Sequence, residues 1–201
     1  MRIAYLHGFN SGPASIKGQQ LGKAIAALPQ AARPEYFLPQ LSHRPAEAMR
    51  TACRWIEAGD REHLTFVGSS LGGFYATHLA EMYGAKGVLI NPAIHPDRDL
   101  APYLGAQRNP YTGEAYELTA GHFAELSAFT VARLTRPQRY LLLVQTGDEV
   151  LDYRMAVAFY AGAWQFLQGG GDHAFHDFAA QIALILRFAG VDPAALERQR
   201  V

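Results

Sequence analysis

The sequence lacks the features that cross-link a chain or insert it into a membrane. Cys53 is the only cysteine, so no intramolecular disulfide can form, and we expect it to be a small buried residue on a helix rather than a nucleophile. No apolar stretch approaches the roughly 20 residues of a membrane-spanning helix. The first residues, Met1 to Leu6, lack the charged and apolar regions of a signal peptide. We therefore expect no stable membrane insertion and a reducing, cytoplasmic setting.

The chain also lacks an excess of charge of either sign. Its 18 lysine and arginine residues balance 18 aspartate and glutamate residues, and no basic run stands out. This balance argues against nucleic acid or an anionic membrane surface as the main partner. Apolar residues make up 49% of the chain and charged residues 18%, which is typical of a globular protein. A length of 201 residues fits one domain, which we place at residues 1–201.

Short apolar runs alternate with longer helical patterns along almost the whole chain. The apolar runs are typical of strands buried on both faces, and they lie at residues 3–6, 35–38, 64–67, 87–90, 140–144 and 164–167. Patterns of helical period lie near residues 14–28, 46–58, 71–83, 152–161 and 174–189. Strands that alternate with helices indicate a parallel sheet. We therefore predict an α/β fold with a doubly wound, mostly parallel sheet of six strands.

The segment that joins the fourth and fifth predicted strands interrupts this alternation. It shows no strand pattern, and it contains a turn-rich stretch at residues 108–114 and a predicted helix from His122 to Arg133. Connections of this kind usually take only a few residues, and long ordered loops are usually functional. We interpret residues 92–137 as a small helical cap that lies over the strand ends. A structural excursion without a substrate role is the alternative.

The strongest functional signal is Gly68-Ser69-Ser70-Leu71-Gly72, a G-x-S-x-G motif between a predicted strand and a predicted helix. This context is what a nucleophile elbow requires, because the tight turn needs small flanking residues and presents the serine hydroxyl above the sheet. Ser70 is the predicted nucleophile, and Ser69 occupies the variable position of the motif. The alternative role for Ser70 is a helix N-cap without chemistry.

A serine hydroxyl is a poor nucleophile until a base removes its proton, so other residues must supply a base and an acid that orients it. In folds with such an elbow the acid follows the serine in the chain, and the histidine follows the acid. Asp148 lies directly after the fifth predicted strand, where the acid is expected. Asp152 is better placed to cap the next helix, and Glu149 is the third candidate. We therefore predict Asp148 as the acid.

His173 is the predicted base. It follows the glycines at 169–171, which let the loop after the sixth strand bend sharply. We expect His176 in the first turn of the last helix, pointing away. The spacing of the two histidines could bind a metal on a helix, but no third ligand accompanies them, so we predict no metal site. A Walker-type phosphate loop is also absent from the sequence, which argues against nucleotide chemistry.

Acyl-transfer chemistry also needs hydrogen-bond donors for a developing oxyanion. The backbone N–H of Leu71, directly after the serine and at the start of a helix, is one candidate. The other is the N–H of Phe9 in the loop after the first strand, where His7-Gly8 is similar to the oxyanion loop of lipases and esterases. We interpret His7 itself as a structural residue that holds this loop by hydrogen bonds.

Six segments together resemble the YqiA-like esterases, a bacterial branch of the α/β-hydrolase superfamily. They follow one another over nearly the whole chain at Tyr5–Ser11, Val67–Gly73, Leu89–Ala93, Asn109–Glu114, Gln145–Tyr153 and Gly170–His173. The resemblance implies the α/β-hydrolase fold, ester hydrolysis, a site without a cofactor and a triad of Ser70, Asp148 and His173.

We therefore expect a serine esterase or thioesterase that acts on small carboxylic esters or acyl thioesters through an acyl-enzyme. The cap aromatics Tyr103, Tyr111, Tyr116 and Phe123 are candidates for a partly apolar acyl pocket, or they pack the cap onto the body. Two further functions stay open. One is a non-catalytic binding protein on a hydrolase scaffold, and the other is amide hydrolysis or acyl transfer with the same triad. The oligomeric state does not follow from the sequence.

Overall fold

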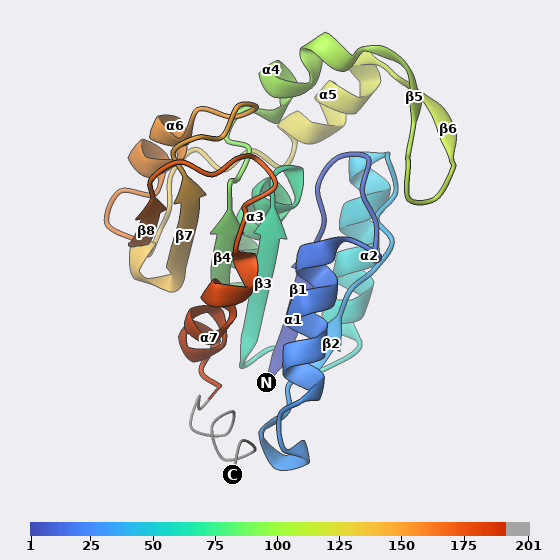
Figure 1. The fold of residues 1–201 in the computed structure, drawn as a ribbon. Coiled ribbons are helices and arrows are strands. Elements are labelled where there is room, and N and C mark those ends of the chain that lie inside the picture. Colours follow the sequence, from blue (N-terminus) through green and yellow to red (C-terminus); the bar gives the residue numbers. More distant parts are fainter. Residues whose placement is uncertain (192–201) are drawn as a thin grey trace.

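A computed structural model describes residues 1–191, so residues 192–201 of the predicted domain lie outside the described part. Six strands form one sheet in the order β2-β1-β3-β4-β7-β8 (Figure 1). They are β1 (Arg2–Leu6), β2 (Glu35–Phe37), β3 (Leu64–Ser69), β4 (Lys86–Ile90), β7 (Tyr140–Gln145) and β8 (Trp164–Gln168). All neighbouring strands are parallel, which confirms the predicted sheet. The carboxyl ends of the strands therefore meet at one edge, where the loops with the predicted site residues begin.

Helices cover both faces of this sheet, as the sequence predicts. One face packs against α1 (Ile16–Ala26) and α7 (Phe178–Ala189). The other packs against α2 (Pro45–Glu57), α3 (Leu71–Tyr83) and α6 (Tyr153–Phe159). Short 3-10 turns lie at η1 (Gln30–Ala32), η2 (Ala101–Tyr103) and η3 (Pro137–Arg139).

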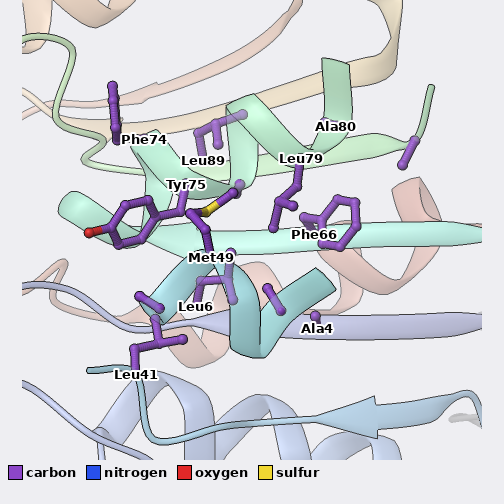
Figure 2. Close-up of a cluster of buried hydrophobic side chains, with 14 of the residues drawn as sticks. Ala4, Leu6, Leu41, Met49, Phe66, Phe74, Tyr75, Leu79, Ala80 and Leu89 are labelled. Carbon is purple, nitrogen blue, oxygen red and sulfur yellow. The ribbon is translucent and has the colours of Figure 1, made fainter. Parts of the chain in front are cut away.

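The central strands β1, β3, β4 and β7 are rich in apolar residues because each contributes alternate residues to two separate cores. In β1, Ile3 belongs to the core beneath α1 and α7, and its neighbour Ala4 belongs to the core beneath α2 and α3. Figure 2 shows the second core, to which Phe66 and Leu89 of the sheet and Leu79 of α3 contribute. Fully burying a side chain of this size stabilises the fold by roughly 1.5–3 kcal/mol. The two cores hold the sheet, and with it the edge that carries the site, in place.

The last helix begins later than predicted. The expected start is residue 174, but Phe175 and Asp177 have φ values of 59° and 62°, which an α-helix does not allow. His176, expected in the first helical turn, therefore lies in an irregular loop before α7. Its Nδ1 atom is 2.7 Å from the Oδ2 atom of Asp172.

The insertion after β4 differs from the predicted helical cap. It contains α4 (Pro96–Leu100), α5 (Ala120–Ser127) and an antiparallel hairpin of β5 (Gly105–Arg108) and β6 (Ala115–Leu118). The prediction that this segment has no strand is wrong. Both strands are short and largely exposed, so they show no apolar run by which the sequence would reveal them. The predicted helix at residues 122–133 is α5, which begins and ends earlier. Figure 1 shows the two helices and the hairpin beyond the carboxyl ends of the sheet strands.

Two further expectations concern the membrane and the cysteine. Within residues 1–191 no helix has the length and hydrophobicity needed to cross a bilayer. Cys53 lies on α2, as predicted, but it is only partly buried. It packs against the core beneath α2 and α3, so its surroundings are those of a small packing residue.

Candidate active site

Ser70 lies in a sharp turn between β3 and α3, at the carboxyl edge of the sheet. Its φ of 56° and ψ of −124° are rarely adopted by residues other than glycine, and such strain costs on the order of 1–3 kcal/mol. A Cβ on Gly68 would lie 2.1 Å from Gly72 O, and a Cβ on Gly72 would lie 2.0 Å from Leu6 O. The two glycines of the motif are therefore steric requirements of the turn. Ser70 occupies the N-cap position of α3, but its side chain makes no capping hydrogen bond.

His173 and Asp148 extend a chain of hydrogen bonds that begins at Ser70. The Nε2 atom of His173 is 3.1 Å from Ser70 Oγ. Its Nδ1 atom is 3.0 Å and 2.9 Å from the two carboxylate oxygens of Asp148. Because an ionised carboxylate can only accept, Nδ1 carries the proton and Nε2 presents its lone pair to the hydroxyl. This tautomer is the one that can take a proton from the serine.

The three acidic residues after β7 have separate positions. The Asp148 side chain is only 2% exposed, and its Oδ1 atom also accepts from two backbone N–H groups of the following turn, at 2.9 Å and 2.8 Å. Asp152 is the N-cap of α6 and accepts from the backbone of the first helical turn, as predicted. Glu149 accepts from the backbone N–H of His173 at 3.0 Å. Asp148 contacts the imidazole, Asp152 caps the N-terminus of α6, and Glu149 accepts a hydrogen bond from the main chain of His173.

Two amide side chains, Asn91 and Gln145, hold the loop that carries His173. Asn91 follows β4, and its Nδ2 atom donates to the carbonyl oxygens of Asp172 at 2.9 Å and His173 at 3.2 Å. Gln145 ends β7 and is fully buried; it accepts from Asp172 N at 3.0 Å and donates to His176 O at 2.7 Å. Its backbone N–H donates to Asn91 Oδ1 at 3.0 Å, which joins the two residues. These bonds provide hydrogen-bond partners for backbone N–H and C=O groups of a loop that does not pair with a strand.

Neither Asn91 nor Gln145 was predicted as a site residue, although both lie in segments that resemble the YqiA-like esterases. The signal available in the sequence is a polar amide at the carboxyl end of an apolar strand, in two adjacent strands of the sheet. Buried polar side chains almost always make hydrogen bonds, so an amide at such a position indicates a bond to a neighbouring loop.

The loop after β1 passes directly beside the elbow. A Cβ on Gly8 would lie 3.2 Å from the Cβ of Ser70. His7 holds this loop, as predicted: its Nε2 atom accepts from Leu41 N at 3.0 Å, and its Nδ1 atom lies 3.0 Å from Gly8 O. Nδ1 therefore carries the proton. Burial lowers the pKa of His7, which keeps the ring neutral and its acceptor available.

The amides proposed for the oxyanion are those of Phe9 and Leu71. In residues 1–191 neither backbone N–H has a protein acceptor. Leu71 N is the first amide of α3, where helical N–H groups are unpaired and the helix dipole favours negative charge. Both residues line a cleft together with Ser70 and His173. Two free amides beside the hydroxyl are the donors that an oxyanion would need.

The hairpin of the insertion is fixed to the same loop. Asn109 donates from its side chain to Ser11 O at 2.8 Å. Asn10, which has a φ of 49°, donates to Gln107 Oε1 at 3.0 Å and accepts from the hydroxyl of Tyr116 at 2.8 Å. The family-like segment around Asn109 thus connects the insertion to the loop that carries Phe9.

Two clefts open beside Ser70 and His173, and both are also lined by Phe9 and Asn10. The first, the apolar cleft, has a volume of about 340 Å³, lies beneath the insertion and is lined by residues that include Pro96, Leu100, Tyr103, Val150 and Leu151. The second, named the polar cleft because it is the more polar of the two, has a volume of about 560 Å³ and is lined by residues that include Tyr5, Ser15, Lys17, Gln20, Tyr111 and His176. Both clefts therefore reach the serine and the histidine of the candidate site.

Of the four aromatic residues predicted for an acyl pocket, two line the clefts and two pack against the body of the protein. Tyr103 lines the apolar cleft, and Tyr111 lines the polar cleft. Tyr116 stacks on His43, with ring centroids 4.1 Å apart. Phe123 packs against the core beneath α2 and α3. Tyr116 and Phe123 therefore attach the insertion to the body, which is the second of the two roles considered for them.

A metal site is not formed by the residues that the structure describes. Among them, His, Cys, Asp and Glu side chains do not gather in groups of three or more that could hold an ion. The two histidines with a spacing of three residues have different partners, Asp148 for His173 and Asp172 for His176.

Comparison with known proteins places the chain in a family. The family described as "Uncharacterised protein family (UPF0227)" matches residues 2–190. The chain belongs to the UPF0227 family. This is the YqiA family, so the resemblance in the sequence is confirmed. A UPF0227 protein of Shewanella baltica is 22% identical over 193 residues, which are 92% of this chain and 98% of the relative.

Solved structures share the fold of this UPF0227 protein. Alpha/beta hydrolase domain-containing protein 10 from mouse matches with a TM-score of 0.73 and 15% identity, over 94% of this chain and 89% of the mouse chain. The esterase domain of a Rhodothermus marinus protein matches with a TM-score of 0.65 and 17% identity, over 94% and 86% of the two chains. These similarities show the α/β-hydrolase fold, as the sequence predicts.

Proposed function

We propose that this UPF0227 protein is a serine hydrolase that cleaves small carboxylic esters or thioesters. Ser70 is the nucleophile, His173 the general base and Asp148 the acid. The observation that carries the proposal is the hydrogen-bond chain from Ser70 Oγ to His173 Nε2, at 3.1 Å, and from His173 Nδ1 to Asp148, at 2.9 Å. Three side chains from three separate loops form this chain beside two free backbone amides, which is the arrangement that acyl transfer requires.

Acylation follows from this arrangement. His173 Nε2 takes the proton of the Ser70 hydroxyl as Oγ attacks the carbonyl carbon of the substrate. The buried carboxylate of Asp148 stabilises the imidazolium that forms. The N–H groups of Phe9 and Leu71 donate to the oxyanion of the tetrahedral intermediate. His173 then gives its proton to the departing alcohol or thiol, and Ser70 keeps the acyl group.

Deacylation uses the same groups in reverse. A water molecule in place of the leaving group gives a proton to His173 Nε2 and attacks the acyl carbonyl. The intermediate collapses, the bond to Ser70 Oγ breaks, and His173 returns the proton to the serine. The free carboxylic acid leaves, and the resting hydrogen bonds form again. No step requires a group beyond the side chains, the two amides, the substrate and water.

The similar proteins support a hydrolase reaction in general terms. Two of the matched structures are named as an α/β-hydrolase domain protein and an esterase domain. Because fold alone does not determine chemistry, the choice of ester or thioester as substrate rests on the site itself. The Ser-His-Asp arrangement supports an enzyme over a binding protein that retains only the scaffold, and labelling of Ser70 by a fluorophosphonate tests the difference.

The test is hydrolysis of p-nitrophenyl butyrate by the wild type, by Ser70→Ala and by Ser69→Ala as the matched control. We expect Ser70→Ala to lower kcat by at least about 1,000-fold with an unchanged circular dichroism spectrum. Ser69→Ala should retain activity of the same order as the wild type. Wild-type activity in Ser70→Ala would contradict the assignment, and faster cleavage of butyranilide than of the ester would make the enzyme an amidase.

A further inference from the structure

The polar cleft contains a cation that the hydrolytic mechanism does not use. Lys17 lies in the first turn of α1 and lines this cleft together with Ser70 and His173. Of the described residues that line the cleft, Lys17 is the one lysine or arginine, and Asp177, which is exposed, is the one carboxylate. The cation therefore shares a cavity with the proposed nucleophile.

Lys17 is not neutralised by an ion pair. Its Nζ atom donates to the carbonyl oxygen of Ala174 at 2.7 Å, and within residues 1–191 no carboxylate oxygen lies within 4.0 Å of it. Burial lowers the pKa of Lys17 to about 8, although the carboxylates of Asp172 and Asp148 raise it. A partly desolvated ammonium without a counterion is unfavourable, and an anion that entered the cleft would reduce this cost.

The two carboxylates whose charges raise the pKa of Lys17 already have other partners. Asp172 lies 2.7 Å from His176 Nδ1, and Asp148 lies 2.9 Å from His173 Nδ1. Ser15 and Gln20 also line the cleft, and their side-chain atoms Oγ and Oε1 are buried without a hydrogen-bond partner among the described residues. The wall around Lys17 therefore combines polar side chains with apolar ones such as Ile16.

The position of His173 indicates which half of a substrate occupies this cleft. During acylation, His173 must give its proton to the alcohol or thiol that departs. The polar cleft is lined by the whole segment from His173 to Phe178, whereas the apolar cleft contacts only His173 of that segment. The apolar walls of the other cleft suit an acyl chain. The departing half therefore fits best on the side of Lys17.

We propose that the polar cleft binds the alcohol or thiol half of the substrate, and that Lys17 selects leaving groups that carry an anionic oxygen group such as a carboxylate or a phosphate. This inference rests on the proposed function and adds a substrate class to it. Lys17 is then a specificity-determining residue, because its ammonium contacts a part of the substrate that does not react.

A pair of matched esters tests this inference: 4-(butyryloxy)benzoate, whose leaving group carries a carboxylate, and 4-(butyryloxy)benzamide, whose leaving group is neutral. The wild type should have the higher kcat/KM for the benzoate. Lys17→Gln should reduce the benzoate-to-benzamide ratio of kcat/KM by about tenfold. The loss of one hydrogen bond to a charged group weakens binding by about this factor. Lys23→Gln, a matched change at an exposed position of the same helix, should leave the ratio unchanged.

The same measurements can overturn the inference. An equal loss of kcat/KM for both esters in Lys17→Gln would mean that Lys17 only supports the loop through its hydrogen bond to Ala174. A wild type that prefers neither the benzoate nor the matched ester with a phosphate in place of the carboxylate would remove the anion site. A preference for one of these two esters decides between the two oxygen groups. If the wild type hydrolyses neither ester and Ser70 is not labelled by a fluorophosphonate, the proposed function itself fails, and this inference fails with it.

Discussion

His173 Nε2 lies 3.1 Å from Ser70 Oγ, although 103 residues separate the two in the chain. The sheet order explains this proximity, because β3, which precedes Ser70, and β8, which precedes the loop of His173, end at the same edge. Asn91 and Gln145 project from the two strands that lie between β3 and β8, and they bridge the remaining distance to the loop. The position of the proposed base is therefore set by the central strands of the fold.

The acid can be tested by two matched substitutions. Asp148→Asn should lower kcat by about 1,000- to 10,000-fold, because an amide that donates to Nδ1 would favour the wrong tautomer of His173. Asp152→Asn should leave kcat nearly unchanged, since asparagine caps a helix as well as aspartate does. Steady-state kinetics with p-nitrophenyl butyrate measures both. Equal losses in the two variants would show that the acid is assigned wrongly.

The role of Gln145 can be separated from its contribution to stability. Gln145→Ala removes the bonds to Asp172 N and His176 O, so the loop of His173 is free to shift and kcat should fall by at least about tenfold with little change in KM. The control is Gln165→Ala, because Gln165 also donates to two backbone carbonyls, at 3.1 Å and 2.8 Å, but away from the site.

Both variants should lose stability by about 1–3 kcal/mol, since each leaves buried backbone groups unpaired. Chemical denaturation measures this loss, and only Gln145→Ala should lose turnover. A similar fall of kcat in both variants would show that Gln145 acts through general stability and does not position the base.

The strain at Ser70 predicts a gain of stability when function is removed. At a φ of 56° and a ψ of −124°, a residue with a Cβ atom pays a steric penalty. Alanine keeps this penalty, whereas glycine avoids it. Ser70→Gly should therefore be more stable than Ser70→Ala by about 1 kcal/mol, and both should be inactive. Urea denaturation of the two variants gives the difference directly. A less stable glycine variant would mean that the elbow is not strained as described.

A histidine pair between the insertion and the body predicts how stability depends on pH. His122 is buried in α5, its Nδ1 atom accepts from Thr119 N at 3.1 Å, and its Nε2 atom lies 3.0 Å from Nδ1 of His43. Nε2 therefore carries the proton, and the ring is neutral. Burial and then the positive charge of Arg44 lower the pKa of His122 below 6.5, while the nearby carboxylate of Glu125 opposes this.

Because the pKa of His122 is lower in the folded state, its contribution to stability is complete above pH 6.5 and is lost as the pH falls below that value. The free energy of unfolding should decrease between pH 7 and pH 5, and His122→Gln should make this decrease smaller. His63→Gln, at an exposed position, is the control and should leave the pH dependence unchanged. An equal slope in the wild type and His122→Gln would contradict the assignment.

Much of the fold and the residues that meet at the candidate site can be predicted from the sequence because they depend on local patterns. The four central strands are buried and produce apolar runs, and the edge strands β2 and β8, although partly exposed, are also rich in apolar side chains, so all six strands can be predicted. The elbow is visible because Gly68 and Gly72 are required by contacts within the turn itself and with the adjacent strand. Asp148 and Asp152 can be distinguished by position alone, since one follows a strand and the other precedes a helix.

Other features depend on contacts that no local pattern reveals. The hairpin of β5 and β6 is held by Asn109 and Asn10, whose partners are about a hundred positions away in the chain. The delayed start of α7 depends on the positive φ values of Phe175 and Asp177, in a loop whose carbonyls are bound by Lys17 and Gln145. In both cases hydrogen bonds from distant segments override the local preference of the chain.

The most direct test is the site of covalent modification by a fluorophosphonate that carries a reporter group, followed by peptide mass spectrometry. The peptide that contains Ser69 and Ser70 should carry one adduct in the wild type and in Ser69→Ala, and none in Ser70→Ala. Labelling should also fall sharply in His173→Ala, because the hydroxyl loses its base. An adduct that persists in Ser70→Ala, or a wild type that remains unlabelled while it hydrolyses esters, would contradict the central claim that Ser70 is the nucleophile.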